Sequence, residues 1–205
     1  MPLNFELAYL FGYAPWDRWG GRPLPRLREL FEGPQAFRPG RVLDLGCGRG
    51  RGTIYLAQLG WRATGVDMVE RALRVARKRA ARANVTVDFV QGDVTQLDSA
   101  GITGPFDLFL DLGCFHILPD EARRLYCGSI TKLAAPDARL LMFAFSHNTH
   151  LFGPRGAERD EIEQSFMPGW TIVWAKPETD LPYRTPRGAT ATWYLLQRVA
   201  PAPKA

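Results

Sequence analysis

The sequence predicts an α/β protein in which helices cover both faces of one mostly parallel sheet. From residue 41 onward, short apolar segments alternate with amphipathic ones, as in strand–helix–strand units with right-handed crossovers. The length of 205 residues fits one ordinary domain with a short N-terminal extension. A Pro-rich loop, without a full helix, joins the last two apolar segments, so we expect the final strand to run antiparallel.

Two parts are expected along the chain: an aromatic lid segment at 1–40 and the main domain at 41–205. The lid is predicted to hold short helices at 3–11 and 24–32. Strands are predicted at 41–45, 61–66, 85–90, 106–111, 139–145, 170–176 and 191–199. Helices are predicted at 51–59, 69–83, 95–100, 120–134 and 157–166. The inner face of the helix at 120–134 is predicted from residues at helical spacing, namely Ala122, Leu125, Tyr126, Ser129, Ile130 and Leu133.

Composition and charge limit the classes of protein that fit. Hydrophobic residues make up 46% and charged residues 23%, which is typical of a globular domain. No apolar run approaches the ~20 residues of a membrane span, and the first residues do not resemble a signal peptide, so a cytoplasmic protein is expected. Three widely spaced cysteines without a CxxC pair indicate reduced thiols. The net charge of +5 is compatible with a polyanionic partner or with a solvated, Arg-rich surface.

The loop after the first strand is rich in glycine and predicts a ligand that approaches the main chain closely. In DLGCGRG at 44–50, alternating glycines permit a sharp turn and leave no Cβ in the way. A dinucleotide-binding fingerprint requires a third glycine, but that place holds Arg51 or Thr53, depending on the register. No Gly-Lys-Ser/Thr follows either, so we expect a ligand without a phosphate at this loop.

Acidic residues follow the second and third strands. Asp67 is placed to accept both hydroxyls of a ribose or to cap the next helix, and Met68 could pack on an adenine face. Asp93 could accept an adenine amine, with the Val94 N–H reaching a ring nitrogen, or could cap the short helix that follows. The pattern indicates a nucleoside ligand.

Three segments taken together identify a family. VLDLGCGRGRGTIYLAQLGWRATGVD, then FVQGDV, then FDLFLDLGCFH, resemble the class I S-adenosylmethionine-dependent methyltransferases. The N-terminal PWDRWGGRP is similar to small bacterial members related to thiopurine and tellurite-resistance methyltransferases. The resemblance implies a three-layer, Rossmann-like fold whose seven-stranded sheet has the order 3-2-1-4-5-7-6 with the last strand antiparallel. It also implies S-adenosyl-L-methionine as methyl donor and S-adenosyl-L-homocysteine as product.

Matched positions give a set of expected cofactor contacts. Those from the lid and the strand ends are Trp16, Arg22, Asp44, Gly46, Cys47, Gly48, Asp67, Met68, Asp93, Val94 and Asp111. Arg49 departs from the family, in which small or hydroxylated residues are commoner at this position, and it places a cation near the cofactor.

Candidates for chemistry follow the fourth and fifth strands. His116, His147 and Asp111 are the predicted catalytic residues, since His titrates near neutrality and suits a base; a satisfied structural His is the alternative. Predicted substrate contacts are Tyr13, Trp19, Phe115 and His116. No metal is expected, because His147 and His150 lack a third ligand nearby. Cys114 lacks the preceding Pro of the cytosine-C5 methyltransferases, which weakens its reading as a nucleophile.

These expectations favour a methyltransferase acting on O, S or N of a small aromatic or apolar molecule, as a monomer or homodimer. An RNA or DNA methyltransferase is the alternative, supported only by the basic charge. A non-catalytic cofactor-binding partner protein is a third possibility.

Overall fold

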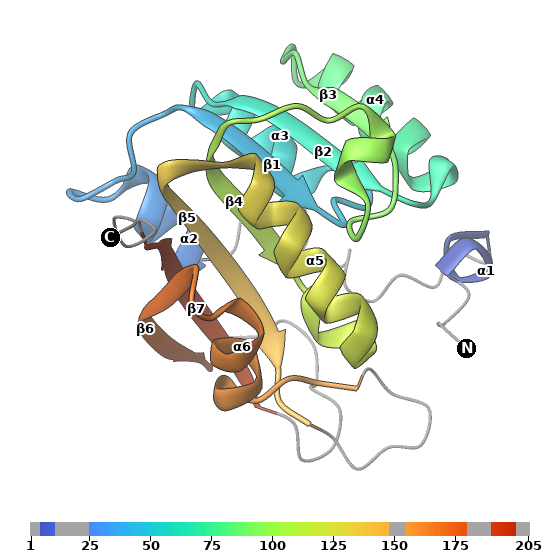
Figure 1. Cartoon of the computed structure of the whole chain (residues 1–205). Helices are drawn as coiled ribbons and strands as arrows, with labels where there is room; N and C mark the ends of the chain where they lie inside the picture. Colours follow the sequence, from blue (N-terminus) through green and yellow to red (C-terminus); the bar gives the residue numbers. More distant parts are fainter. Residues whose placement is uncertain (1–4, 11–24, 148–154, 180–189, 200–205) are drawn as a thin grey trace.

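The computed structural model describes residues 5–10, 25–147, 155–179 and 190–199, which build a seven-stranded sheet between two layers of helices (Figure 1). The strand order is β3-β2-β1-β4-β5-β7-β6. The strands are β1 (Arg41–Leu45), β2 (Arg62–Asp67), β3 (Asp88–Gln91), β4 (Phe106–Leu112), β5 (Ala134–Phe145), β6 (Trp170–Glu178) and β7 (Ala191–Arg198). β1 to β5 pair in parallel, and β7 is antiparallel to β5 and β6. The predicted fold class and strand order are confirmed.

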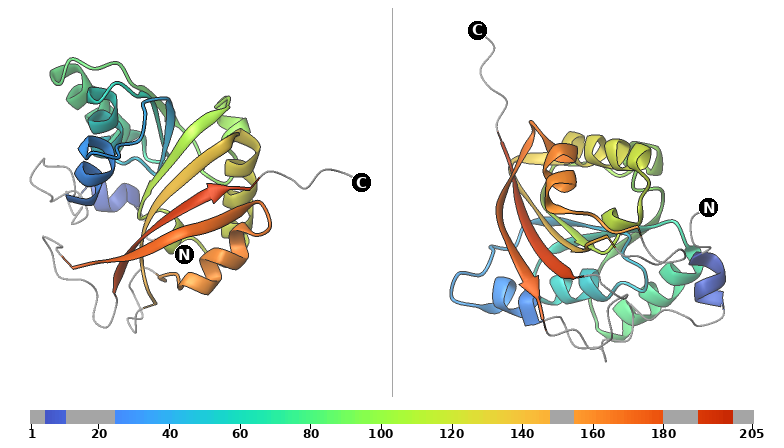
Figure 2. Two further views of the ribbon diagram at one scale, coloured as in Figure 1. Left: turned by 90° about the vertical axis from the view of Figure 1, so that its left-hand side faces the viewer. Right: turned by 90° about the horizontal axis from the view of Figure 1, so that it is seen from below.

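Helices occupy the two faces of the sheet as separate layers (Figure 2). One layer holds α2 (Pro25–Glu32), α3 (Arg51–Gln58) and α4 (Glu70–Arg82), and the other holds α5 (Asp120–Leu133) and α6 (Arg159–Phe166). The short α1 (Phe5–Leu10) lies beside α4 (Figure 1). Two single 3-10 turns, η2 (Leu97–Ala100) and η3 (Phe115–Ile117), flank β4. No helix among the described residues combines the length and apolar character of a membrane crossing.

Alternate side chains of the central strands fill two separate cores. Leu43 of β1 and Phe109 of β4 belong to the core under α5 and α6. Val42 and Leu108, their neighbours along the same strands, belong to the core under α2 and α3. Burial on both faces is the reason that these strands read as nearly continuous apolar runs.

The face that α5 turns to the sheet differs from the predicted one. Leu125, predicted to face inward, is 50% exposed, whereas Arg123 is 2% exposed. The Tyr126 hydroxyl donates a hydrogen bond to the Asp111 carboxylate of β4, and this contact fixes the rotation of the helix. The arginine therefore lies inside with Tyr126, and Leu125 faces solvent.

β5 also begins earlier than predicted, at Ala134. Its pairing with β4 is irregular, because Phe106 lies opposite Ala134 whereas Leu108 lies opposite Arg139. The intervening residues of β5 form a bulge, and their polar, Pro-containing sequence hides the extended conformation from a pattern-based prediction.

Asp111, at the carboxyl end of β4, is fully buried and anchors the turn into η3. Its Oδ1 accepts hydrogen bonds from the N–H groups of Gly113 (2.8 Å) and Cys114 (2.6 Å). Its Oδ2 accepts from the N–H of Phe115 (2.9 Å) and from the Tyr126 hydroxyl. Burial raises the pKa of this carboxyl, and these hydrogen bonds oppose the rise. Both oxygens of Asp111 are thus engaged inside the protein, and its catalytic and cofactor-binding roles stay predictions.

We expect Asp111→Ala to lower the free energy of unfolding by about 3–5 kcal/mol, because one hydroxyl and three backbone N–H groups lose their acceptor in the interior. Urea denaturation measures the change. Asp98→Ala is the control, since it removes an exposed carboxylate that pairs with Lys132 at 3.2 Å, and such pairs contribute less than about 1 kcal/mol. Similar losses for both variants would contradict the anchoring role of Asp111.

Candidate active site

The loop between β1 and α3 turns through three glycines in the left-handed backbone region. Gly46, Gly48 and Gly50 have φ of +68°, +54° and +73°, values that other residues adopt only with strain. The Cys47 N–H donates to the Val66 carbonyl of β2 (2.9 Å), which holds the loop against the neighbouring strand. The loop therefore presents main-chain atoms, without side chains at the glycines, at the carboxyl edge of the sheet.

Asp67, the last residue of β2, connects the glycine loop to the start of α4. Its Oδ2 accepts a hydrogen bond from the Gly48 N–H (2.8 Å), and its Oδ1 accepts one from the Val69 N–H (2.8 Å). The residue is 9% exposed, and burial raises the pKa of its carboxyl. The second lone pair of each oxygen lies at the edge where parallel sheets bind nucleosides.

Asp44 lies beneath the glycine loop with 2% of its surface exposed. It accepts a hydrogen bond from the Thr53 hydroxyl of α3 (2.6 Å). Burial raises the pKa of Asp44 to about 7, and the nearby carboxylates of Asp111 and Asp67 contribute to the rise. This side chain supports the loop from below.

The adenine contacts predicted after β2 and β3 lie at the surface of the same edge. The side chain of Met68 is 58% exposed, as a packing surface for a flat ring requires. Asp93 is exposed, and its Oδ1 accepts from both the N–H and the hydroxyl of Thr95 (2.8 Å each). Asp93 therefore shapes the turn before η2 and does not cap the 3-10 turn itself. The Val94 side chain is buried.

The first helix covers the glycine loop from outside. Tyr9 of α1 is 8% exposed and packs with Val69 and Ala72. Its hydroxyl lies 2.7 Å from the place that a Cβ on Gly48 would occupy, and the Arg49 guanidinium lies 5.2 Å from the centre of its ring. Sequence reasoning did not single out Tyr9 as a site residue. The predicted lid contacts Tyr13, Trp16, Trp19 and Arg22 lie outside the described residues.

His116 in η3 is 4% exposed, and its Nδ1 is buried without a hydrogen-bond partner among the described residues. The ring bonds the Phe143 carbonyl, so Nε2 carries the proton and Nδ1 is an acceptor. Burial, and secondarily the positive charge of Arg123, lower the pKa of His116 to about 4. The neutral ring therefore offers a lone pair at the carboxyl end of β4.

Phe115, predicted to contact substrate, belongs to the core. It is fully buried, with its ring centre 5.5 Å from that of Tyr126 and 5.7 Å from that of Phe166. The expected substrate contact is corrected, because the short η3 turn directs this ring inward against α5 and α6.

His147, predicted as a base, has both ring nitrogens engaged. Nδ1 lies 2.9 Å from the Arg155 carbonyl, and Nε2 lies 2.7 Å from the Glu161 carboxylate. Its backbone N–H donates to Glu158 (3.0 Å). These contacts bind the ring into the connection between β5 and α6, and the catalytic role of His147 stays a prediction.

Cys47 and Cys114 lie next to the buried carboxylates of the site. Burial raises the pKa of both thiols well above the ordinary value. The negative charges of Asp44 and Asp67 add to the rise at both thiols, and that of Asp111 adds to it at Cys114. A thiolate is the nucleophilic form of cysteine, so this environment opposes the nucleophilic reading of Cys114.

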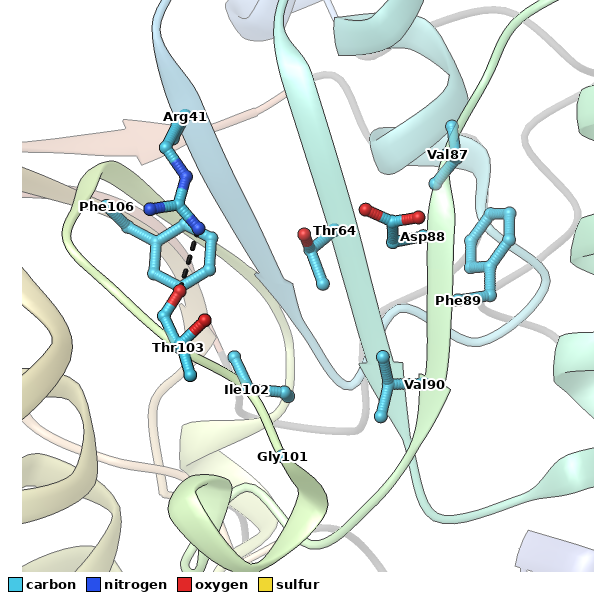
Figure 3. A pocket seen from close by; sticks show the side chains of 10 residues that line it. All are labelled: Arg41, Thr64, Val87, Asp88, Phe89, Val90, Gly101, Ile102, Thr103 and Phe106. Carbon is cyan, nitrogen blue, oxygen red and sulfur yellow. Dashed lines mark hydrogen bonds between the residues drawn. The ribbon is translucent and has the colours of Figure 1, made fainter.

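A cavity of about 420 Å³ lies at the opposite edge of the sheet (Figure 3). Its lining includes the first residues of three strands, Arg41, Asp88 and Phe106. Arg41 already donates to the carbonyls of Thr103 and Pro105. Because ligands of such folds bind at the carboxyl ends of the strands, we place the site at the glycine loop and not in this cavity.

Comparison with known proteins gives a consistent result. The methyltransferase domain family matches residues 42–137. The chain is 32% identical to the 2-heptyl-1-hydroxyquinolin-4(1H)-one methyltransferase of Mycobacteroides abscessus, over 82% of this chain and 76% of that protein.

Two solved structures share the fold. The 1,6-didemethyltoxoflavin-N1-methyltransferase of Burkholderia thailandensis, with bound 1,6-didemethyltoxoflavin and S-adenosylhomocysteine, has a TM-score of 0.73 at 27% identity and covers 96% of this chain and 86% of that chain. TehB from Haemophilus influenzae has a TM-score of 0.70 at 17% identity and covers 95% and 67%.

The relatives agree on one family and one methyl donor, and the predicted family, enzyme class and cofactor are confirmed. The chain belongs to the class I methyltransferases that use S-adenosylmethionine.

Proposed function

We propose that this enzyme methylates O, S or N of a small aromatic or apolar molecule that donates a hydrogen bond. The observation that carries the proposal is the Nδ1 atom of His116, which is buried and has no partner among the described residues. His116 follows β4, at the same edge of the sheet as the glycine loop. Its surroundings are apolar, with the Phe145 ring centre 5.2 Å from that of His116. An enclosed acceptor among aromatic side chains suits a compact ligand with one polar group.

The names of two relatives support an aromatic acceptor. The mycobacterial relative is named for a hydroxyquinolinone, and the Burkholderia enzyme for a toxoflavin precursor methylated at N1. Both names refer to heterocyclic ring systems, and the second gives a ring nitrogen as the atom methylated. We therefore place a heteroaromatic hydroxyl or ring N–H first among the acceptors.

We infer that the cofactor lies along the glycine loop, which fits it because Gly46 and Gly48 present bare main chain at positive φ. The Asp67 carboxylate would accept hydrogen bonds from the ribose hydroxyls, and Met68 would cover the adenine. The other proposed contacts are Asp44, Cys47, Asp93 and Val94, with Trp16 and Arg22 from the lid. S-adenosylmethionine supplies an electrophilic methyl group on a sulfonium.

The protein's contribution to the reaction is alignment more than acid–base chemistry. In-line attack on the methyl carbon displaces a neutral thioether and needs no acid, so proximity and orientation supply most of the acceleration. In our proposal Nδ1 of His116 accepts the hydrogen bond of the substrate O–H or N–H and orients its lone pair toward the methyl group. A pKa of about 4 makes His116 an orienting acceptor and a weak base, so the substrate proton is released to solvent once its O or N has bonded to the methyl carbon and the thioether has left.

The test of this function is turnover on a panel of acceptors, with release of S-adenosylhomocysteine as the readout. The panel contains 2-heptyl-1-hydroxyquinolin-4(1H)-one, a phenol, a thiol, an amine and an RNA mixture. We expect the highest rate with the hydroxyquinolinone or another heteroaromatic. Transfer to RNA alone, with salt-dependent retention of RNA, would support the nucleic-acid alternative. Cofactor binding without any transfer would support a non-catalytic partner protein.

We expect Asp67→Ala to weaken binding of S-adenosylhomocysteine by about 1.5–3 kcal/mol, because a charged acceptor of two hydroxyl hydrogen bonds is lost. The change corresponds to roughly 10- to 150-fold in Kd by calorimetry. Asp88→Ala is the control, because this exposed carboxylate begins β3 at the other edge of the sheet. Unchanged affinity in Asp67→Ala would show that the ribose assignment is wrong.

Removal of residues 1–23 is expected to leave a folded sheet but to lower turnover by about a hundredfold, since the lid excludes water and aligns the substrate. The structure adds that Tyr9 covers Val69 and the glycine loop, so cofactor affinity also falls. Circular dichroism and single-turnover rates measure the two effects, and removal of 200–205 is the control. Full turnover by the truncated protein would show that the segment has no role in methyl transfer. Loss of folding would show that its aromatic side chains belong to the core.

A further inference from the structure

Arg123 carries a charge into the interior of the α5–α6 layer. Its side chain is 3% exposed, and its ion pair with Glu161 of α6 is long, at 3.7 Å. The guanidinium carbon lies 5.0 Å from the centre of the Phe115 ring. A buried arginine costs free energy that one distant carboxylate does not offset, so its other contacts need a separate explanation.

Those contacts are backbone carbonyls of two segments that are far apart in the sequence. Nε donates to the Leu118 carbonyl (3.0 Å), and Nη2 donates to the Gly156 carbonyl and lies 3.5 Å from that of His116. The Gly156 N–H in turn donates to the His116 carbonyl (2.9 Å). A planar guanidinium with several fixed donors can bridge such a set, whereas an ammonium on a flexible stem cannot.

The bridge joins the backbone of His116, which lies in η3, to the segment that leads into α6. These elements lie on one face of the sheet (Figures 1 and 2). The imidazole is held from β5, by the Phe143 carbonyl and the Phe145 ring, and approaches Gly113 at the end of β4. The orientation of Nδ1 therefore depends on a turn that Arg123 holds in place.

Arg123 also acts on the charge of the His116 ring. Among the described residues, the groups that face this ring are the Phe143 carbonyl and Phe145 ring from β5, the Gly113 backbone directly after β4, and the Arg123 guanidinium from α5. Among these, Arg123 alone carries a charge, and it disfavours a second proton on the imidazole and so adds to the effect of burial on the pKa.

We propose that Arg123 is a positioning residue for methyl transfer, which fixes the η3 turn and keeps the His116 ring neutral with Nδ1 facing the substrate's O–H or N–H. The inference rests on the proposed function, because it assumes that His116 meets the methyl acceptor. It assigns two separable effects, hydrogen bonding and positive charge, to one side chain outside the site itself.

Three variants separate these effects. Arg123→Gln removes the charge, and Arg123→Lys keeps the charge but loses the bridging geometry. Arg124→Gln is the matched control. Arg124 is the next residue on α5, its side chain is 69% exposed, and it pairs with Glu121 on the helix surface. The readouts are the NMR titration of the His116 ring, assigned with His116→Phe, and kcat and KM with the best acceptor of the panel.

In Arg123→Gln we expect the midpoint of the His116 titration to move to higher pH, and the acidic limb of the kcat profile to move with it. We expect kcat to fall about tenfold with the KM for S-adenosylmethionine changed less than about twofold. In Arg123→Lys the midpoint should stay near that of the wild type while kcat still falls. Arg124→Gln should match the wild type in both readouts.

A folded Arg123→Gln with unchanged midpoint and kcat would overturn the proposal, as would equal effects in Arg124→Gln. If Arg123→Gln does not fold, Arg123→Lys decides: a lower kcat at constant KM supports the bridge, and wild-type kcat overturns it. Full turnover by His116→Phe would instead refute the proposed role of His116, and the catalytic role of Arg123 with it. A normal loss in His116→Phe beside wild-type behaviour of both Arg123 variants would refute Arg123 alone.

Discussion

Carboxylates buried at the carboxyl ends of three adjacent strands are the constraint on which the site depends. Asp44, Asp67 and Asp111 lie at or next to the ends of β1, β2 and β4 and are at most 9% exposed. A buried carboxylate requires hydrogen-bond donors. For Asp67 and Asp111 these include N–H groups of the loops that follow the strands, whereas Asp44 accepts from the Thr53 hydroxyl of α3. The carboxylates therefore determine the paths of those loops, which form the edge where the cofactor is proposed to bind.

The same carboxylates set the electrostatic character of this edge. Together with burial, which is the larger cause, they raise the pKa of the Cys47 and Cys114 thiols, so the cysteines serve as small packing groups. The pKa of Asp44 rises toward neutral pH because burial and the other two carboxylates disfavour its charged form. A cationic ligand relieves such repulsion, and this is a physical reason why a sulfonium cofactor fits next to them. Removing one carboxylate changes both the loop it holds and the charge felt by its neighbours.

Much of the fold could be predicted from the sequence, because the alternation of strands and helices and the glycines in the turns between them are local signals. The strand order came from the family resemblance, and the structure agrees with it. The errors share a cause in tertiary contacts. Periodicity placed Leu125 inside, but the bond between Tyr126 and Asp111 turns α5 so that Arg123 is buried. An arginine at the spacing of the buried positions was the available signal.

Site residues divide in the same way. The glycine loop and Asp67 were predictable because strand ends in a parallel sheet share one edge. Asp111 and His147 were assigned as reactive groups because of their residue types, whereas their oxygens and ring nitrogens are used within the protein. Residue type shows which chemistry a side chain can perform. Only the structure shows which of its polar atoms already have partners within the described part of the chain.

Arg49, which departs from the family pattern, has a physical explanation in the contact between loop and lid. Its guanidinium lies over the Tyr9 ring at 5.2 Å, and cation–π contacts of this kind are stabilising. The Tyr9 hydroxyl approaches Gly48 so closely that a Cβ there would be 2.7 Å away. The glycine is thus required twice, for its positive φ and for the approach of α1. The cation that the sequence placed near the cofactor instead faces α1, so the glycine loop organises the lid on one side and the proposed ribose site at Asp67 on the other.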